Sequence, residues 1–73
     1  MPKLYSARQV IKSLQRLGFE IVSQKGSHVK LRKTTGGNMF SPIVPNHKEI
    51  AMGTLQSILR QGGITKEELD EKI

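Results

Sequence analysis

The sequence predicts a small α+β domain in which a helix, three antiparallel strands and a second helix form two layers, with a short helix at the C-terminus. Apolar residues recur at helical spacing near both ends of the chain. Between them, short apolar runs alternate with glycine-containing turns, which is typical of β-hairpins. We expect residues 1–73 to form a single domain, because a chain of this length builds only one core.

The first helix is expected over residues 7–17. Ser6 and Gln9 have the spacing of a capping box, in which each side chain accepts a hydrogen bond from the other residue's backbone N–H. Gly18 can end the helix by adopting a positive φ. The apolar stripe of this helix consists of Val10, Ile11, Leu14 and Leu17.

Three strands should follow, because β-branched and aromatic residues concentrate in three short runs. Glycines mark the turns at residues 25–27 and 34–37, and connections this short imply antiparallel hairpins. Pro42 lacks a backbone N–H, so the third strand should lie at an edge or end early. The expected strands are residues 19–23, 28–33 and 38–44.

Two more helices are expected after the sheet. The first of them should begin near Gly53, with Thr54 as its N-cap, and stop at the next pair of glycines. Thr65 and Glu68 repeat the capping-box spacing and predict a short last helix. The apolar contacts of these two helices would be Leu55, Ile58, Leu59, Leu69 and Ile73.

The charge of the chain indicates an anionic partner. Lys and Arg total 12 against 6 acidic residues, for a net charge of +6. Four of the acids lie after residue 66, so the rest of the chain holds only Glu20 and Glu49 against most of the cations. Nucleic acid is the commonest partner of such a surface, and a charged surface that only maintains solubility is the alternative.

Composition excludes several classes of protein. The chain has no cysteine, so it has neither disulfides nor a thiolate zinc site, which fits a reducing cytosol. No apolar run suits a signal peptide or a membrane span, so we expect a soluble, cytoplasmic protein with no membrane partner. Two histidines are too few for zinc and the main body has no carboxylate cluster for magnesium, so no metal or other cofactor is expected.

The second expected strand brings a histidine together with cations. Neighbouring side chains of a strand point to opposite faces. If Val29 and Leu31 enter the core, then His28, Lys30 and Arg32 share the open face. In the first strand, the sequence does not decide which side chains point to the core, because the neighbours Ile21 and Val22 are both apolar. The third strand is ambiguous for the same reason.

An exposed imidazole among cations suits cleavage of RNA. A neutral imidazole takes the proton from a 2′-hydroxyl, because its ordinary pKa of about 6.5 lies near the working pH. Cations nearby stabilise the charge that develops on the phosphoryl oxygens. Lys25 and Ser27, in the turn before the strand, adjoin this face. A surface histidine with no catalytic role is the ordinary alternative.

Three segments, in this order, resemble the motifs of the HicA toxin family. They are Gly26-Ser27-His28, Val44-Pro45-Asn46-His47 and Gly53-Thr54-Leu55-Gln56-Ser57-Ile58-Leu59. The resemblance covers about residues 6–70 and includes the opening helix with Gly18-Phe19. Each segment is weakly specific alone, whereas the ordered set in a chain of this length is fairly specific.

The resemblance implies a fold like the double-stranded-RNA-binding domain and the toxin of a type II toxin–antitoxin system. Such a toxin would cleave mRNA without a metal, with His28 as its general base, and a HicB-like antitoxin would mask the site. The alternative is a non-catalytic RNA-binding module of the same fold. No firm role carries over to His47, which could shape its loop, contact RNA or cap the next helix. We predict RNA contacts at Lys25, Ser27, Lys30, Arg32 and His47.

Overall fold

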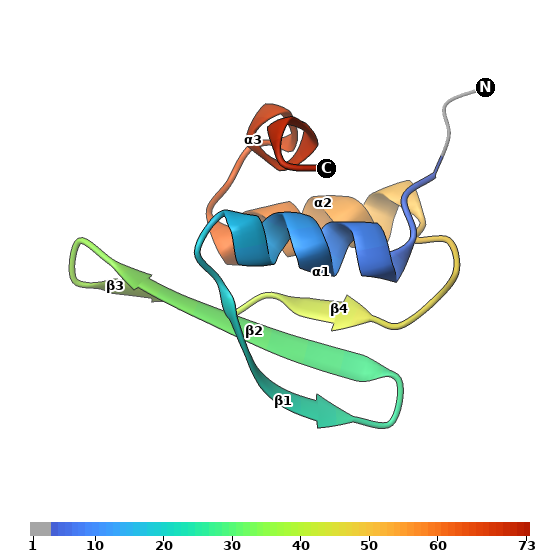
Figure 1. Ribbon diagram of the computed structural model, residues 1–73, viewed down its shortest axis with the longest axis horizontal. Coiled ribbons are helices and arrows are strands. Elements are labelled where there is room, and N and C mark those ends of the chain that lie inside the picture. The colour runs from blue at the N-terminus through green and yellow to red at the C-terminus, as the bar shows by residue number, and fades with distance from the viewer. Residues whose placement is uncertain (1–3) are drawn as a thin grey trace.

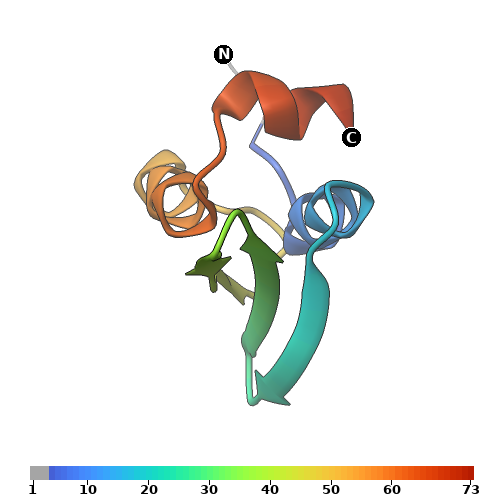
Figure 2. The ribbon, with the colours of Figure 1, turned by 90° about the vertical axis from the view of Figure 1, so that its left-hand side faces the viewer.

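The computed structural model describes residues 4–73, so residues 1–3, where we expected no signal segment, lie outside the described residues. Two helices cover one face of an antiparallel sheet, and a third helix lies on the side of this pair away from the sheet (Figures 1 and 2). The predicted α+β class and element order are confirmed, with the arrangement of the double-stranded-RNA-binding-domain-like fold. In chain order the elements are α1 (Ala7–Arg16), β1 (Glu20–Lys25), β2 (His28–Thr35), β3 (Asn38–Phe40), β4 (Ile43–Pro45), α2 (Met52–Gly62) and α3 (Lys66–Glu71).

Local hydrogen bonds define the starts of α1 and α3 as predicted. The Gln9 backbone N–H donates to Ser6 Oγ at 3.1 Å, and the Ser6 N–H donates to Gln9 Oε1 at 3.0 Å. Thr65 and Glu68 form the same reciprocal pair at the start of α3. Both capping boxes are confirmed, because each depends only on residues three apart in the chain.

The start of α2 differs from the prediction. The helix begins at Met52, its N-cap is Ala51, and no side chain caps it, so the assignment of Thr54 as N-cap was wrong. A long-range contact sets this start: Ile50 is buried, and its backbone N–H donates to the Tyr5 carbonyl at 2.7 Å. The residues around the start of α2 carry no sequence signal that would predict such a long-range contact.

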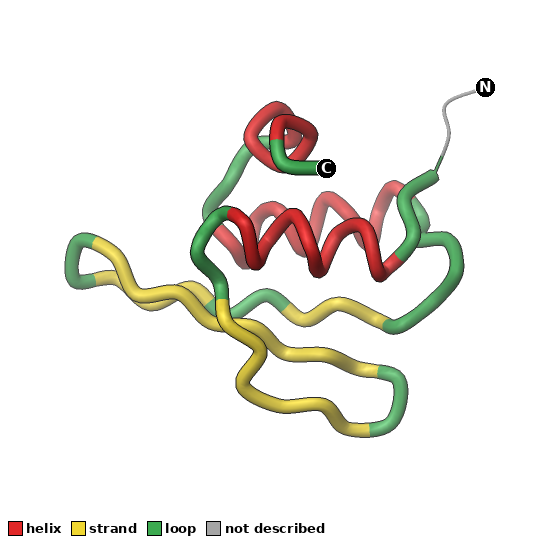
Figure 3. Tube along the Cα trace, viewed as in Figure 1, coloured by secondary structure: helices red, strands yellow, loops and turns green. Residues whose placement is uncertain are grey.

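Strand β2 is the centre of the sheet and pairs with all the other strands. The predicted third strand is present as β3 and β4, which pair with β2 in one continuous register from Lys33↔Phe40 to Lys30↔Ile43. Between them, the Leu31 N–H still donates to the Pro42 carbonyl at 3.0 Å. Pro42 therefore interrupts the strand without shifting it. Figure 3 shows the β2–β3 hairpin extending beyond the helices.

The core lies between the sheet and the helices. Val29 and Leu31 of β2 are buried against apolar residues of α1 and α2, as the alternation predicted. Lys33 also turns toward the helices, where its ammonium donates to the Leu17 carbonyl at 2.7 Å and lies 5.6 Å from the centre of the Phe19 ring. This cation therefore stabilises the C-terminal end of α1.

Helix α3 is attached to α1 by one buried side chain and several polar contacts. Leu69 is fully buried, and the Ser13 hydroxyl donates to its carbonyl at 2.6 Å. Tyr5 donates its hydroxyl hydrogen to Asp70, which also forms an ion pair with Lys66 at 2.9 Å. The Tyr5 hydroxyl, followed by the Lys66 ammonium, lowers the pKa of Asp70 below its ordinary range.

We predict that the docking of α3 weakens in acid and that Asp70→Asn reduces this effect. A carboxyl whose pKa is lowered by folding contributes stability above its unfolded pKa, and this stability is lost as the pH falls through the folded pKa. Chemical denaturation between about pH 5 and pH 2 should therefore show a shallower loss of unfolding free energy in Asp70→Asn than in wild type. Glu71→Gln is the matched control, and equal slopes for all three proteins would contradict the prediction.

Candidate functional site

His28 begins β2 on the sheet face that points away from the helices, and its side chain is exposed. Lys25 of β1 pairs directly with it on one side, and Pro45 of β4 pairs with it on the other. Side chains that face each other across antiparallel strands lie about 4.5–5.5 Å apart at Cβ. The register thus places a fixed cation beside the imidazole.

A second row of side chains lies two residues further along β2. Lys30 is flanked by Ser23 of β1 and by Ile43 of β4. Together with Lys25 and His28, these three residues line a shallow depression on the open face. We call this depression the His28 depression. It presents an imidazole, two ammonium groups and a hydroxyl to solvent beside one aliphatic side chain.

The two lysines of the His28 depression have no neutralising acid. Within residues 4–73, the ion pair between Lys66 and Asp70 is the only one, and it lies on α3. Arg32, further along the same strand, is placed differently because its direct cross-strand partner is Glu20. The positive potential of the open face should therefore be strongest around Lys25 and Lys30.

The β1–β2 turn holds Lys25 and His28 together. Its two central residues are Gly26, with φ of 56°, and Ser27, whose φ is not positive. This is the backbone pattern of a type II′ hairpin turn, in which glycine occupies the first central position. The Ser27 carbonyl accepts a hydrogen bond from the backbone N–H of Asn46, so the segment after β4 supports the turn.

His47 lies outside the His28 depression. It lines a different hollow with Ser6, Arg8, Asn46 and Lys48, at the start of α1. Its carbonyl accepts a hydrogen bond from the Ala7 N–H at 3.0 Å, which satisfies one of the free donors at the N-terminus of this helix. The structure thus shows a backbone role for His47 in fixing α1.

Of the six predicted site residues, the structure gathers Lys25, His28 and Lys30 in one depression and places Ser27 in the adjoining turn. Sequence reasoning missed Ser23 and Ile43. A two-residue turn at Gly26 would have identified Ser23, because the pairing of Lys25 with His28 continues to Ser23 with Lys30. A two-residue turn at Gly36-Gly37 gives the pairing of Ile43 with Lys30 in the same way, but Pro42 left open whether the strand kept its register that far.

Residues 4–73 contain neither a metal-binding cluster nor a membrane-spanning helix. No three histidine or acidic side chains among these residues lie close enough together to hold a metal ion. No helix in this part of the chain has the length and apolarity that crossing a bilayer requires.

The fold and the open basic face place this chain in the class of small proteins with a double-stranded-RNA-binding-domain-like fold. Residues 7–64 match the family described as the HicA toxin of bacterial toxin–antitoxin systems, and the chain belongs to this family. It is therefore a toxin with a cognate antitoxin as its partner, as the sequence motifs predicted. The match extends from the start of α1 to the residue after Gly63 and leaves out α3. No curated protein matches the chain.

We predict that Gly26→Ala destabilises the hairpin that carries Lys25 and His28. A residue with a Cβ at the positive φ of this position costs roughly 1–3 kcal/mol, although no neighbouring atom would meet the added carbon. The free energy of unfolding should fall by about this amount in urea denaturation. Gly53→Ala, at an equally open helical position, is the control and should cause no loss.

Proposed function

We propose that this toxin is an endoribonuclease that cleaves mRNA in the cytoplasm, with His28 as its general base. The observation that supports this proposal most directly is the His28 depression. There an exposed imidazole lies beside Lys25 of the neighbouring strand, and Lys30 follows two residues along its own strand on the same face. Membership of a toxin family supplies the biological setting, in which a HicB-like antitoxin restrains the activity.

The chemistry requires a deprotonated 2′-oxygen next to a phosphodiester. His28 takes the 2′-hydroxyl proton, the 2′-oxygen forms a bond to phosphorus, and the bond from phosphorus to the 5′-oxygen breaks. The leaving 5′-oxygen takes a proton from solvent, which leaves a 2′,3′-cyclic phosphate and a 5′-hydroxyl end. Lys25 and Lys30 stabilise the negative charge on the phosphoryl oxygens as the bond to the 2′-oxygen forms.

This mechanism assigns no step to a metal and predicts modest rates. One positioned acid–base group contributes about a hundred- to ten-thousandfold in rate. Slow cleavage is still sufficient for toxicity when the substrate is the mRNA of the whole cell. Ser27 and Arg32 would extend the contact with the RNA backbone along the open face, and His47 would contact RNA beyond it.

The test of this proposal compares wild type with His28→Ala. The variant should lose RNA cleavage by at least about a hundredfold and should no longer arrest bacterial growth, while it retains its fold and its RNA affinity. His47→Ala is the matched histidine control and should retain cleavage. Wild-type cleavage should persist in EDTA.

Two results would overturn the proposal. Undiminished cleavage by His28→Ala would remove this residue from the mechanism. RNA binding by pure wild type with no cleavage under any condition would favour the non-catalytic RNA-binding module.

We also predict that Lys30 contributes a phosphate contact. RNA affinity falls linearly with salt on logarithmic axes, and the slope reflects the number of phosphates that the protein neutralises. Lys30→Gln should weaken RNA binding and reduce this slope by about one. Arg60→Gln removes the same charge from α2, away from the sheet, and should leave the slope unchanged. Equal slopes for wild type and Lys30→Gln would contradict the contact.

A further inference from the structure

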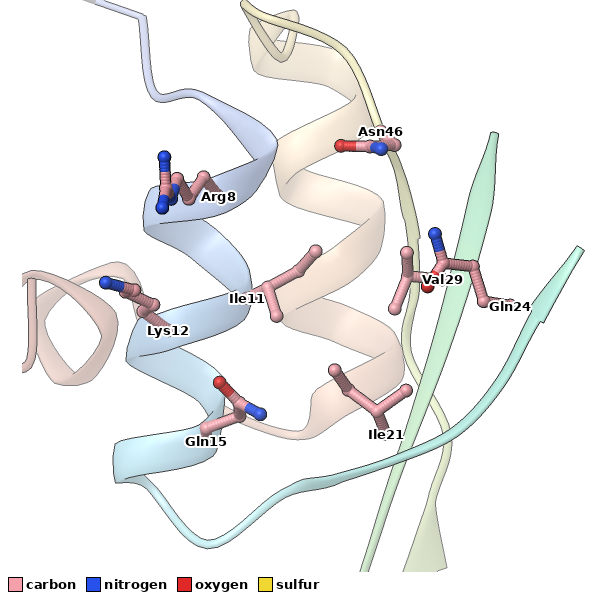
Figure 4. A pocket seen from close by; sticks show the side chains of 8 residues that line it. All are labelled: Arg8, Ile11, Lys12, Gln15, Ile21, Gln24, Val29 and Asn46. Carbon is pink, nitrogen blue, oxygen red and sulfur yellow. The ribbon is translucent and has the colours of Figure 1, made fainter. Parts of the chain in front are cut away.

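A second group of unneutralised cations lies on the opposite side of the β1–β2 hairpin from His28. Arg8 and Lys12 of α1 are exposed, and neither forms an ion pair within residues 4–73. They line a groove between α1 and β1 of about 320 Å³ (Figure 4). We call this the α1–β1 groove. It shares no residue with the His28 depression.

The inner part of the α1–β1 groove is aliphatic. Ile11 of α1, Ile21 of β1 and Val29 of β2 lie between the two walls (Figure 4). Ile21 is 46% exposed, although it pairs with the fully buried Leu31 and so points to the helix side of the sheet. An aliphatic side chain of this size left half in water is typical of a surface that a partner covers.

A β-bulge in β1 creates this apolar wall. The pairing changes register between Ile21 and Ser23, so that Val22 is the extra residue. Without the bulge, Ile21 and Gln24, three residues apart, would point to opposite faces. With it, both line the groove. The bulge also disrupts the free edge of β1, which favours docking of partner side chains over addition of a partner strand.

The chemistry of the α1–β1 groove favours a protein segment as its occupant. Its charged residues are all basic, and its polar residues are the amides Gln15, Gln24 and Asn46. An RNA held through its phosphates alone would leave the three aliphatic side chains of this groove in water. Aliphatic contacts bordered on the α1 side by two cations instead complement a segment with aliphatic and carboxylate side chains.

We propose that the α1–β1 groove binds an acidic segment of the cognate antitoxin, which inserts an aliphatic side chain between Ile11 and Ile21 and pairs its carboxylates with Arg8 and Lys12. This inference rests on the toxin–antitoxin part of the proposed function and is independent of the role of His28. It separates the attachment of the antitoxin from the covering of the His28 depression. The two contacts lie on opposite faces of one hairpin.

The experiment measures antitoxin affinity and toxicity in the same variants. Lys12→Glu and Ile21→Ser change the groove without touching the His28 depression. With the purified cognate antitoxin as the probe, calorimetry should show a Kd raised about tenfold or more for each variant. Growth arrest and RNA binding by the toxin alone should match wild type. Arg60→Glu, the same charge change on α2, is the control and should bind the antitoxin normally.

Each alternative outcome overturns the inference. Unchanged antitoxin affinity in both groove variants would exclude the groove as an attachment site. Normal antitoxin affinity with weaker RNA binding would make the groove part of the RNA surface instead. Circular dichroism of Lys12→Glu, a substitution at an exposed helical position, establishes that a lost affinity is not a lost fold. If His28→Ala failed to abolish cleavage, the antitoxin affinities of the groove variants would still test this inference, because the groove does not include His28.

Discussion

Burial of Val29 and Leu31 on one face of β2 is the constraint on which the rest of the structure depends. Because side chains alternate along a strand, these two residues cannot face the core unless His28, Lys30 and Arg32 face solvent. A slip of one residue would exchange the two sets, placing an imidazole and cations in the core and aliphatic side chains in water. The same packing energy that stabilises the sheet therefore determines which chemistry it displays.

Strand β1, next to β2, contributes to two distinct surfaces, one on the open face of the sheet and one on the helix side. On the open side, a glycine turn and an uninterrupted register bring Lys25 and Ser23 beside His28 and Lys30. On the helix side, the bulge at Val22 brings Ile21 toward α1. A strand of six residues thus contributes to both the His28 depression and the α1–β1 groove.

The net charge counts every basic residue equally, but the contacts of these residues in the structure differ. Lys33 binds a helix-terminal carbonyl, Lys66 pairs with Asp70, and Arg16 donates to the Lys72 carbonyl at 2.7 Å. These side chains support the fold. The cations of the His28 depression and the α1–β1 groove have no such partner among residues 4–73. The charge excess of the chain predicted an anionic partner, but only the contacts reveal which cations remain for it.

The sequence by itself determined the features that depend on residues close together in the chain: both capping boxes, the two glycine turns, the alternation of β2 and the family motifs. Tertiary structure decided the rest. It moved the start of α2 to Met52 through the contact of Ile50 with Tyr5. It resolved the ambiguity between Ile21 and Val22 with a bulge, and it placed Ile43 in the His28 depression and His47 outside it. Each of these outcomes depends on pairing or packing between segments distant in the chain, and local propensity carries no information about such contacts.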